Sequence, residues 1–136
     1  MKALWLGALL AGAAAAMAQV QAPAPCPLPA QTGLPQMLGL WRAEFQGLWQ
    51  GATLLIEPHP EDEGSFRGAI NRNGERGVLA GDLQGGELAL RESDDGKRLS
   101  ALWLGDVVEG SCGREIRGSW QAEGDVTPRN FVLRKQ

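Results

Sequence analysis

Short runs in which apolar and polar residues alternate fill the chain from Met37 to its end. In the first run Trp41, Ala43 and Phe45 alternate with polar residues, which is the period of a strand with one buried face. The same period predicts strands over 53–57, 66–71, 77–83, 87–92, 98–104 and 129–135. One further strand lies around 106–111 or merges with 116–121, and no apolar repeat of helical period is long enough for a helix.

The connections between these runs are short and rich in turn residues. Asn73-Gly74, Gly85-Gly86 and Asp95-Gly96 are typical hairpin turns, which join antiparallel neighbours and leave no room for parallel crossovers. We therefore predict an all-β fold, a single small antiparallel up-and-down barrel of about eight strands. The barrel is preferred to a sandwich because closure removes both exposed edge strands.

The N-terminal region divides into two segments ahead of the barrel. Met1 and Lys2 precede an apolar run and an A-x-A site at 16–18, so residues 1–18 are expected to be a signal peptide that is cleaved before Gln19. Residues 19–36 are proline-rich and are expected to form an extended leader, with the barrel domain over 37–136. The apolar run is too short for a membrane anchor, so we expect a periplasmic or secreted protein with no stable membrane span.

The chain has two cysteines, and both lie after the expected cleavage site. Thiols exported into an oxidising compartment pair readily, so Cys26 and Cys112 are predicted to form a disulfide that ties the leader to the barrel. Cys26 as a lipid-attachment cysteine is disfavoured because Pro25 and Pro27 flank it.

The acidic balance of the chain limits its partners. Removal of residues 1–18 takes away Lys2 and changes the formal net charge from −3 to −4. Nucleic acids and anionic membranes select basic patches, so neither is expected as a partner.

No group of residues has the composition of a catalytic or metal site. His59 is the only histidine and stands between two prolines, so it lacks the further ligands that a metal needs. The acidic run around Glu61, Asp62 and Glu63 does not have the spacing of a calcium loop and is expected to be a solvated turn. We therefore expect no catalytic residues, no metal and no cofactor.

The aromatic residues are the strongest candidates for core or ligand contacts. The residues that are expected to fill the barrel or line its mouth are Trp41, Trp49, Phe66, Trp103 and Trp120. The alternating phase further predicts one core that contains Trp41, Phe45, Phe66, Ile70, Trp103, Trp120, Phe131 and Leu133.

From Leu38 to Lys135 the pattern resembles the avidin and lipocalin group of small secreted barrels. Gly39-Leu40-Trp41 is similar to the opening G-x-W strand of that group, and residues 64–68 are similar to the G-x-F-x-G of avidins. The resemblance implies a barrel with a ligand-binding mouth. Three positions at which avidins carry polar biotin ligands are Ala43, Ala52 and Ile70 here, so the resemblance does not extend to biotin binding.

Two functional hypotheses remain open at this level. The first is a non-catalytic exported module that binds another envelope protein, as an accessory subunit or an inhibitor. The second is a carrier that holds a small apolar ligand in the barrel mouth.

Overall fold

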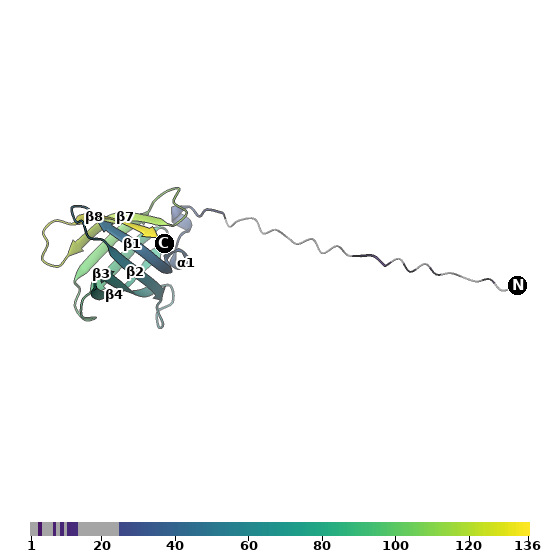
Figure 1. Ribbon diagram of the computed structural model, residues 1–136, viewed down its shortest axis with the longest axis horizontal. Helices are drawn as coiled ribbons and strands as arrows, with labels where there is room; N and C mark the ends of the chain where they lie inside the picture. The colour runs from purple at the N-terminus through teal and green to yellow at the C-terminus, as the bar shows by residue number, and fades with distance from the viewer. Residues whose placement is uncertain (1–2, 4–6, 8, 10, 14–24) are drawn as a thin grey trace.

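The computed structural model describes residues 3, 7, 9, 11–13 and 25–136 of the chain. Eight strands hydrogen-bond in chain order, and the last pairs with the first, so the sheet is a closed antiparallel up-and-down barrel (Figure 1). The strands are β1 (Gly39–Phe45), β2 (Ala52–Pro58), β3 (Phe66–Arg72), β4 (Glu75–Gln84), β5 (Glu87–Ser93), β6 (Ala101–Val107), β7 (Glu115–Ala122) and β8 (Arg129–Lys135). The predicted all-β barrel is confirmed.

The strand that the sequence left ambiguous is β7. Asp106 and Val107 complete β6, and a loop follows before β7 begins at Glu115. Within this loop the Ser111 hydroxyl donates to the carbonyls of Val108 and Glu115, so the polar residues of 108–114 support a turn. The seventh strand is therefore the segment that contains 116–121, and no separate or merged strand forms over 106–111, because 106–107 belong to β6 and the rest is loop.

The predicted core is confirmed by burial. In β1, Trp41, Ala43 and Phe45 point inward, whereas Arg42 and Glu44 are exposed. The other predicted members are buried in the same cluster, except that Trp120 is partly buried and packs against it: Phe66, Ile70, Trp103, Phe131 and Leu133. Each large apolar side chain removed from water contributes about 1.5 to 3 kcal/mol to folding.

Two inward glycines make room for a ring. Gly105 in β6 lies directly opposite Gly118 in β7. A Cβ atom at Gly118 would stand 1.9 Å from the Leu104 carbonyl oxygen, and one at Gly105 would stand 2.9 Å from Cζ of Phe131. Glycine is required here because neighbouring backbone and a core ring occupy the space of a side chain.

The described part of the leader differs from the expected extended chain. It forms a 3₁₀ turn, η1 (Pro29–Gln31), and one α-helical turn, α1 (Leu34–Met37). Pro29 and Pro35 stand in the first turns of these elements, where a fixed φ favours a helix and the missing N–H is not needed. Two of the prolines that predicted an extended segment, Pro29 and Pro35, therefore begin helical turns instead.

The predicted signal peptide, residues 1–18, lies outside the described residues apart from positions 3, 7, 9 and 11–13, and so do residues 19–24 of the leader. Within the part of the chain that the structure describes, no helix has the length and apolar character needed to cross a membrane.

Candidate binding face at the open end of the barrel

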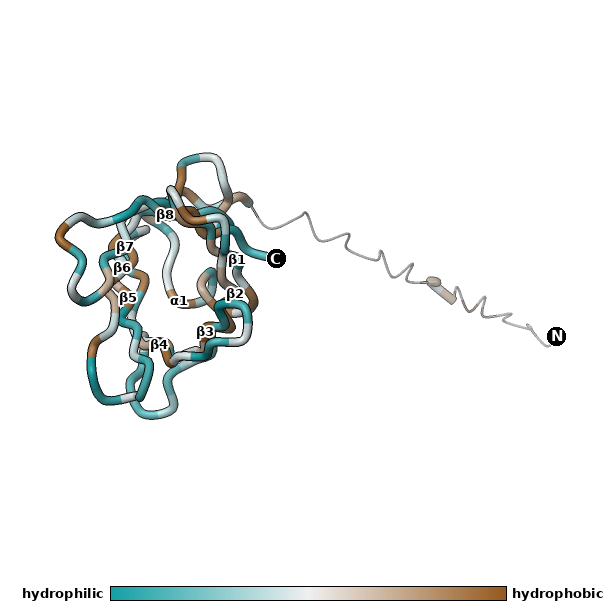
Figure 2. Tube along the Cα trace, turned by 60° about the vertical axis from the view of Figure 1, so that its left-hand side comes forward, coloured by the Kyte–Doolittle hydropathy of each residue, from teal (hydrophilic) through white to brown (hydrophobic). Residues whose placement is uncertain are grey.

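The two ends of the barrel are built differently. Figure 2 shows the strands as a ring in chain order, with α1 inside the outline of the ring. We call the end that carries η1, α1 and the β6–β7 loop the plugged end. The opposite end, which this N-terminal segment does not cover, carries the loops 46–51, 73–74, 94–100 and 123–128, and we call it the open end.

Backbone contacts hold the plugged end together. Met37 is fully buried, and its carbonyl accepts a 2.8 Å hydrogen bond from Nε1 of Trp41. Nζ of Lys135 donates to the Gln36 carbonyl at 2.8 Å and lies 5.7 Å from the centre of the Trp41 ring. Burial, and after it the nearby charge of Arg114, lowers the pKa of Lys135 below its usual 10.5.

The predicted disulfide between Cys26 and Cys112 is present, with the two Cα atoms 4.6 Å apart. It joins the segment before η1 to the β6–β7 loop, where Cys112 and Gly113 both have positive φ in a tight turn. The carbonyl of Thr32, a buried residue, accepts a further hydrogen bond from the Gly86 amide at 3.3 Å. The disulfide fits a protein of an oxidising compartment.

Aromatic rings fill the interior toward the open end. Trp103 lies 4.9 Å from Phe131 and 5.3 Å from Phe45 between ring centres, and Phe45 lies 4.9 Å from Trp120. The buried Nε1 atoms of Trp103 and Trp120 have no hydrogen-bond partner among the described residues. Pockets line the outer wall and the loops, and the buried side chains of the core pack together inside the barrel.

A buried ion pair covers these rings at the open end. Glu92 is 2% exposed, and its Oε2 accepts a 3.0 Å hydrogen bond from Nη2 of Arg72. Oε1 lies at ion-pair distance from Nη1 but has no aligned donor. The Arg72 guanidinium also stands 5.5 Å from the Phe45 ring and 5.2 Å from the Trp120 ring, within cation–π distance.

Sequence reasoning missed this ion pair. Arg72 follows the buried Ile70 by two residues and Glu92 follows the buried Leu90 by two, so both lie on the inward phase of their strands. That phase was the available signal, because an inward charge requires a partner inside the barrel.

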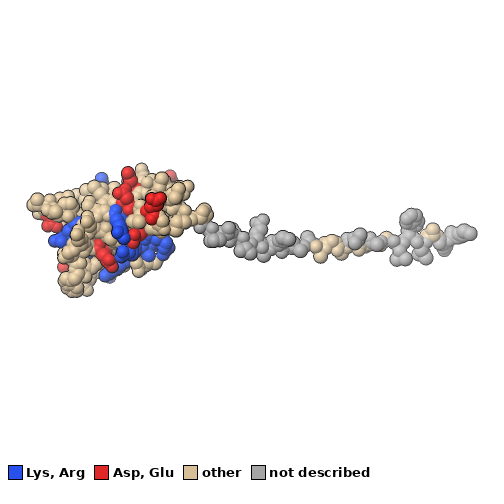
Figure 3. All heavy atoms as spheres, turned by 90° about the horizontal axis from the view of Figure 1, so that it is seen from above, with Lys and Arg blue, Asp and Glu red and all other residues tan. Residues whose placement is uncertain are grey.

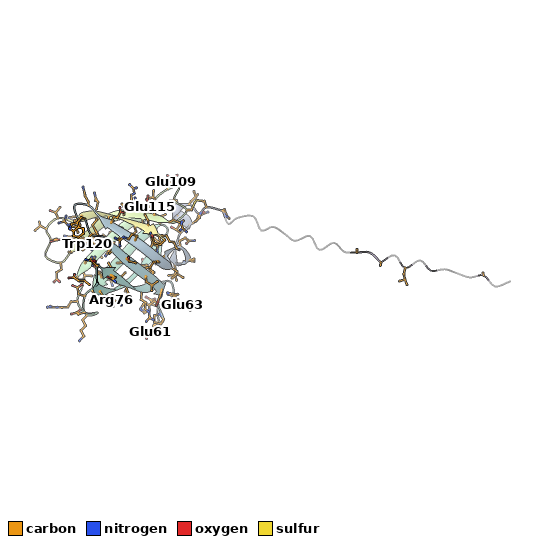
Figure 4. All side chains as sticks on the ribbon, viewed as in Figure 1. Glu61, Glu63, Arg76, Glu109, Glu115 and Trp120 are labelled. Atoms are coloured by element: carbon orange, nitrogen blue, oxygen red, sulfur yellow. A yellow bond between two sulfur atoms is a disulfide. The ribbon has the colours of Figure 1, made fainter. Side chains whose placement is uncertain are left out.

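The loops of the open end expose large apolar side chains. Trp49 is 93% exposed and Val126 is 95% exposed, and Leu48 and Leu99 are about half exposed. Trp49 thus differs from the other candidate aromatics, because it stands on the β1–β2 loop and outside the core. In Figure 4 Trp120 lies toward the open end, whereas Glu63 and Glu109 lie toward α1.

Beside Trp49 lies a shallow pocket of about 350 Å³ with a mainly polar lining. Its lining residues come from β1, the β1–β2 loop and the β3–β4 turn: Arg42, Trp49, Gln50, Gly51 and Asn73. Arg42 is oriented by a 3.3 Å hydrogen bond from Nη1 to the Thr53 hydroxyl. No carboxylate pairs with Arg42 among the described residues, and Glu44, two residues further along β1, pairs with Arg134.

Several other charged side chains of the surface are paired or shape turns. On the face seen in Figure 3, basic and acidic side chains lie side by side. Among the ion pairs of the surface, Arg134 contacts both Glu44 and Glu115. Nδ1 of His59 accepts the amides of Glu61 and Asp62 at 3.1 Å each, so this histidine shapes the β2–β3 loop.

Asp95 shapes the β5–β6 loop in the same way. Its Oδ1 accepts the amides of Lys97 and Arg98 at 2.8 and 2.9 Å. Backbone hydrogen bonds from Arg98 and then Lys97 lower the pKa of Asp95 below its usual 3.8. The carboxylate is thus a turn-forming group, as expected for aspartate at such positions.

Comparison with known protein families and with curated proteins finds no match to the chain. Ala43, Ala52 and Ile70 are buried in the core. The geometry of the open end is therefore the basis for a functional proposal.

Proposed function

We propose that the protein is a non-catalytic, exported binding module that attaches to another component of the cell envelope through the open end of its barrel. The observation that carries this proposal is the exposure of apolar side chains on three loops of that end, led by Trp49 and Val126. Large exposed apolar side chains that lie at one end of a barrel are candidates for an interaction site, and tryptophan is among the residues that contribute most to binding interfaces.

The packing of the barrel supports attachment through its surface in preference to the carrier alternative. Buried rings fill the interior, and the Arg72–Glu92 ion pair stands above them. A ligand would have to displace these groups before entering the barrel mouth. An accessory subunit or an inhibitor would instead bind its partner through the exposed loops, with no rearrangement of the core. Kinship with the avidin and lipocalin barrels and a periplasmic or secreted location remain predictions.

Retention on isolated cell-envelope fragments tests the proposal. The full chain is expressed with its own N-terminus, and the fraction of protein that sediments with washed envelope is measured. Trp49→Ala and Leu99→Ser should reduce the retained fraction about tenfold if each removes a central contact. Leu104→Ser is the matched control, because Leu104 on the barrel wall is as exposed as Leu99, at 50%.

Equal losses in Leu99→Ser and Leu104→Ser, or no retention of the unchanged protein, would contradict the proposal. N-terminal sequencing of the same protein tests the export prediction, which requires the mature chain to begin at Gln19. A chain that keeps Met1 and stays in the cytoplasm would contradict it.

A further inference from the structure

We infer that the pocket beside Trp49 binds an acidic saccharide, that is, a sugar unit that carries a carboxylate. This inference rests on the proposed function and names the class of envelope component that the open end recognises. The pocket joins an exposed indole ring to one guanidinium and two side-chain amides.

The ring of Trp49 provides the apolar surface of the pocket. Because this side chain is 93% exposed, folding buries almost none of its apolar surface. A bound partner that covers the ring would therefore gain the hydrophobic free energy of burying it. A pyranose ring presents a flat face of C–H groups, which can cover an indole while its hydroxyls stay at the edge. A sugar thus offers both an apolar face for the Trp49 ring and hydroxyl groups for the polar lining of the pocket.

The polar lining fits hydroxyl groups. Gln50 and Asn73 each carry two N–H donors and a carbonyl acceptor, and a hydroxyl both donates and accepts. An apolar peptide side chain would leave these amides without partners, and unsatisfied polar groups cost binding free energy. The lining therefore favours a saccharide over an apolar peptide segment.

Arg42 is the reason to expect an acid. Its guanidinium lies against the backbone of Gly51, since a Cβ at Gly51 would stand 3.0 Å from Nη2. The hydrogen bond to Thr53 fixes one edge of the guanidinium, and no carboxylate of the described residues pairs with the rest. A planar, oriented guanidinium without a counter-ion matches a carboxylate in geometry and charge.

The place of Gly51 preserves this arrangement. A side chain there would also meet the Ala43 carbonyl oxygen at 2.3 Å, so only glycine fits between β1 and the Arg42 side chain. Asn73 reaches the same pocket from the two-residue β3–β4 turn, where it holds a φ of 50° that asparagine tolerates well. The pocket is therefore built from strand β1, the β1–β2 loop that carries Trp49, and a tight turn.

Calorimetric titration with two matched glycans tests the inference. The probes are a hyaluronan tetrasaccharide, which alternates glucuronic acid with N-acetylglucosamine, and chitotetraose, which is neutral N-acetylglucosamine alone. The unchanged protein should bind the acidic glycan at least about tenfold more tightly, because a charge-assisted hydrogen bond is lost with the neutral one. The emission of the exposed Trp49 should change as the glycan saturates.

Two variants and one control assign the binding to this pocket. Trp49→Ala should abolish binding of both glycans, whereas Arg42→Gln should reduce the preference for the acidic glycan to near one. Arg91→Gln removes an exposed arginine of β5 that does not line the pocket, and it should leave both affinities unchanged. Unchanged melting temperatures would show that each variant is folded.

Other outcomes overturn the inference and separate it from the proposed function. Equal affinity for the two glycans would overturn the carboxylate assignment. If neither glycan binds but Leu99→Ser still loses envelope retention, the assignment of a saccharide ligand is wrong and the proposed function stands. If an acidic Glu-Leu peptide binds saturably and neither glycan binds, the saccharide assignment is also wrong, and the open end binds a protein partner. Absence of both glycan binding and envelope retention would overturn the two proposals together.

Discussion

The plugged end and the open end of this barrel are closed by different kinds of contact. At the plugged end a disulfide and hydrogen bonds to the main chain hold α1 over the core. At the open end the Arg72–Glu92 ion pair and the rings beneath it cover the core. Main-chain hydrogen bonds, such as the one from the Glu123 amide to the Ser100 carbonyl at 2.8 Å, join neighbouring loops there. The disulfide and the docked N-terminal segment cover one end, whereas the loops of the other end expose the side chains that we propose for recognition.

Among the contacts at the two ends, the disulfide is expected to make the largest single contribution to the free energy of unfolding. It closes a loop of 86 residues, so its loss should lower the free energy of unfolding by about 4.5 kcal/mol in the chain-entropy estimate. Thermal melts with and without reductant, followed by far-ultraviolet circular dichroism, measure the effect. The melting temperature should fall while the folded β signal stays, because the barrel core does not include Cys26. The double Cys→Ser variant is the control, and a reductant effect on that variant would contradict the assignment.

Trp41→Ala tests the plugged end without touching the disulfide. Trp41 is fully buried and donates to the Met37 carbonyl, so truncation leaves a cavity and an unpaired acceptor. The expected loss is about 4 kcal/mol, measured by urea unfolding. Trp49→Ala, which removes an exposed ring, should change stability by less than about 0.5 kcal/mol. Similar losses of stability in the two variants would contradict the placement of Trp41 in the core and of Trp49 on the surface.

The ion pair at the open end is tested by removing one partner and then both. Glu92→Leu strands the Arg72 guanidinium against the aromatic rings and should cost about 3 kcal/mol. Adding Arg72→Met to Glu92→Leu should recover most of that loss, because a well-packed apolar pair replaces buried charges at little net cost. Urea unfolding of the two variants measures the coupling. A double variant less stable than Glu92→Leu alone would mean that Arg72 stabilises the barrel independently of Glu92.

The smallest expected effect is the pH dependence caused by Lys135. Its pKa is lower in the folded protein than in the unfolded chain, so the unfolded chain binds more protons between the lowered value and 10.5. Stability should therefore rise with pH through that window, and this contribution should be absent in Lys135→Met. Urea midpoints of both proteins across the window measure the difference. Parallel pH profiles would contradict the burial of the Lys135 ammonium.

Alternation and turn chemistry in the sequence determined the barrel itself. The period of two placed Trp41, Trp103 and Phe131 inside, because a strand turns successive side chains to opposite faces. Asn73-Gly74 and Gly85-Gly86 set hairpins, which forced antiparallel neighbours. The cysteine count and its expected compartment were sufficient to pair Cys26 with Cys112.

Only the tertiary structure decided which residues meet at each end. Pro29 and Pro35 suit both an extended chain and the first turn of a helix, and packing of Met37 over the core selects the helical turns. The contact of Arg72 with Glu92, and the pocket that joins Arg42 to Asn73, depend on strand register and barrel closure. Alternation encodes the face of a strand on which a side chain lies, but the partner across the barrel is set by pairings between segments far apart in the chain.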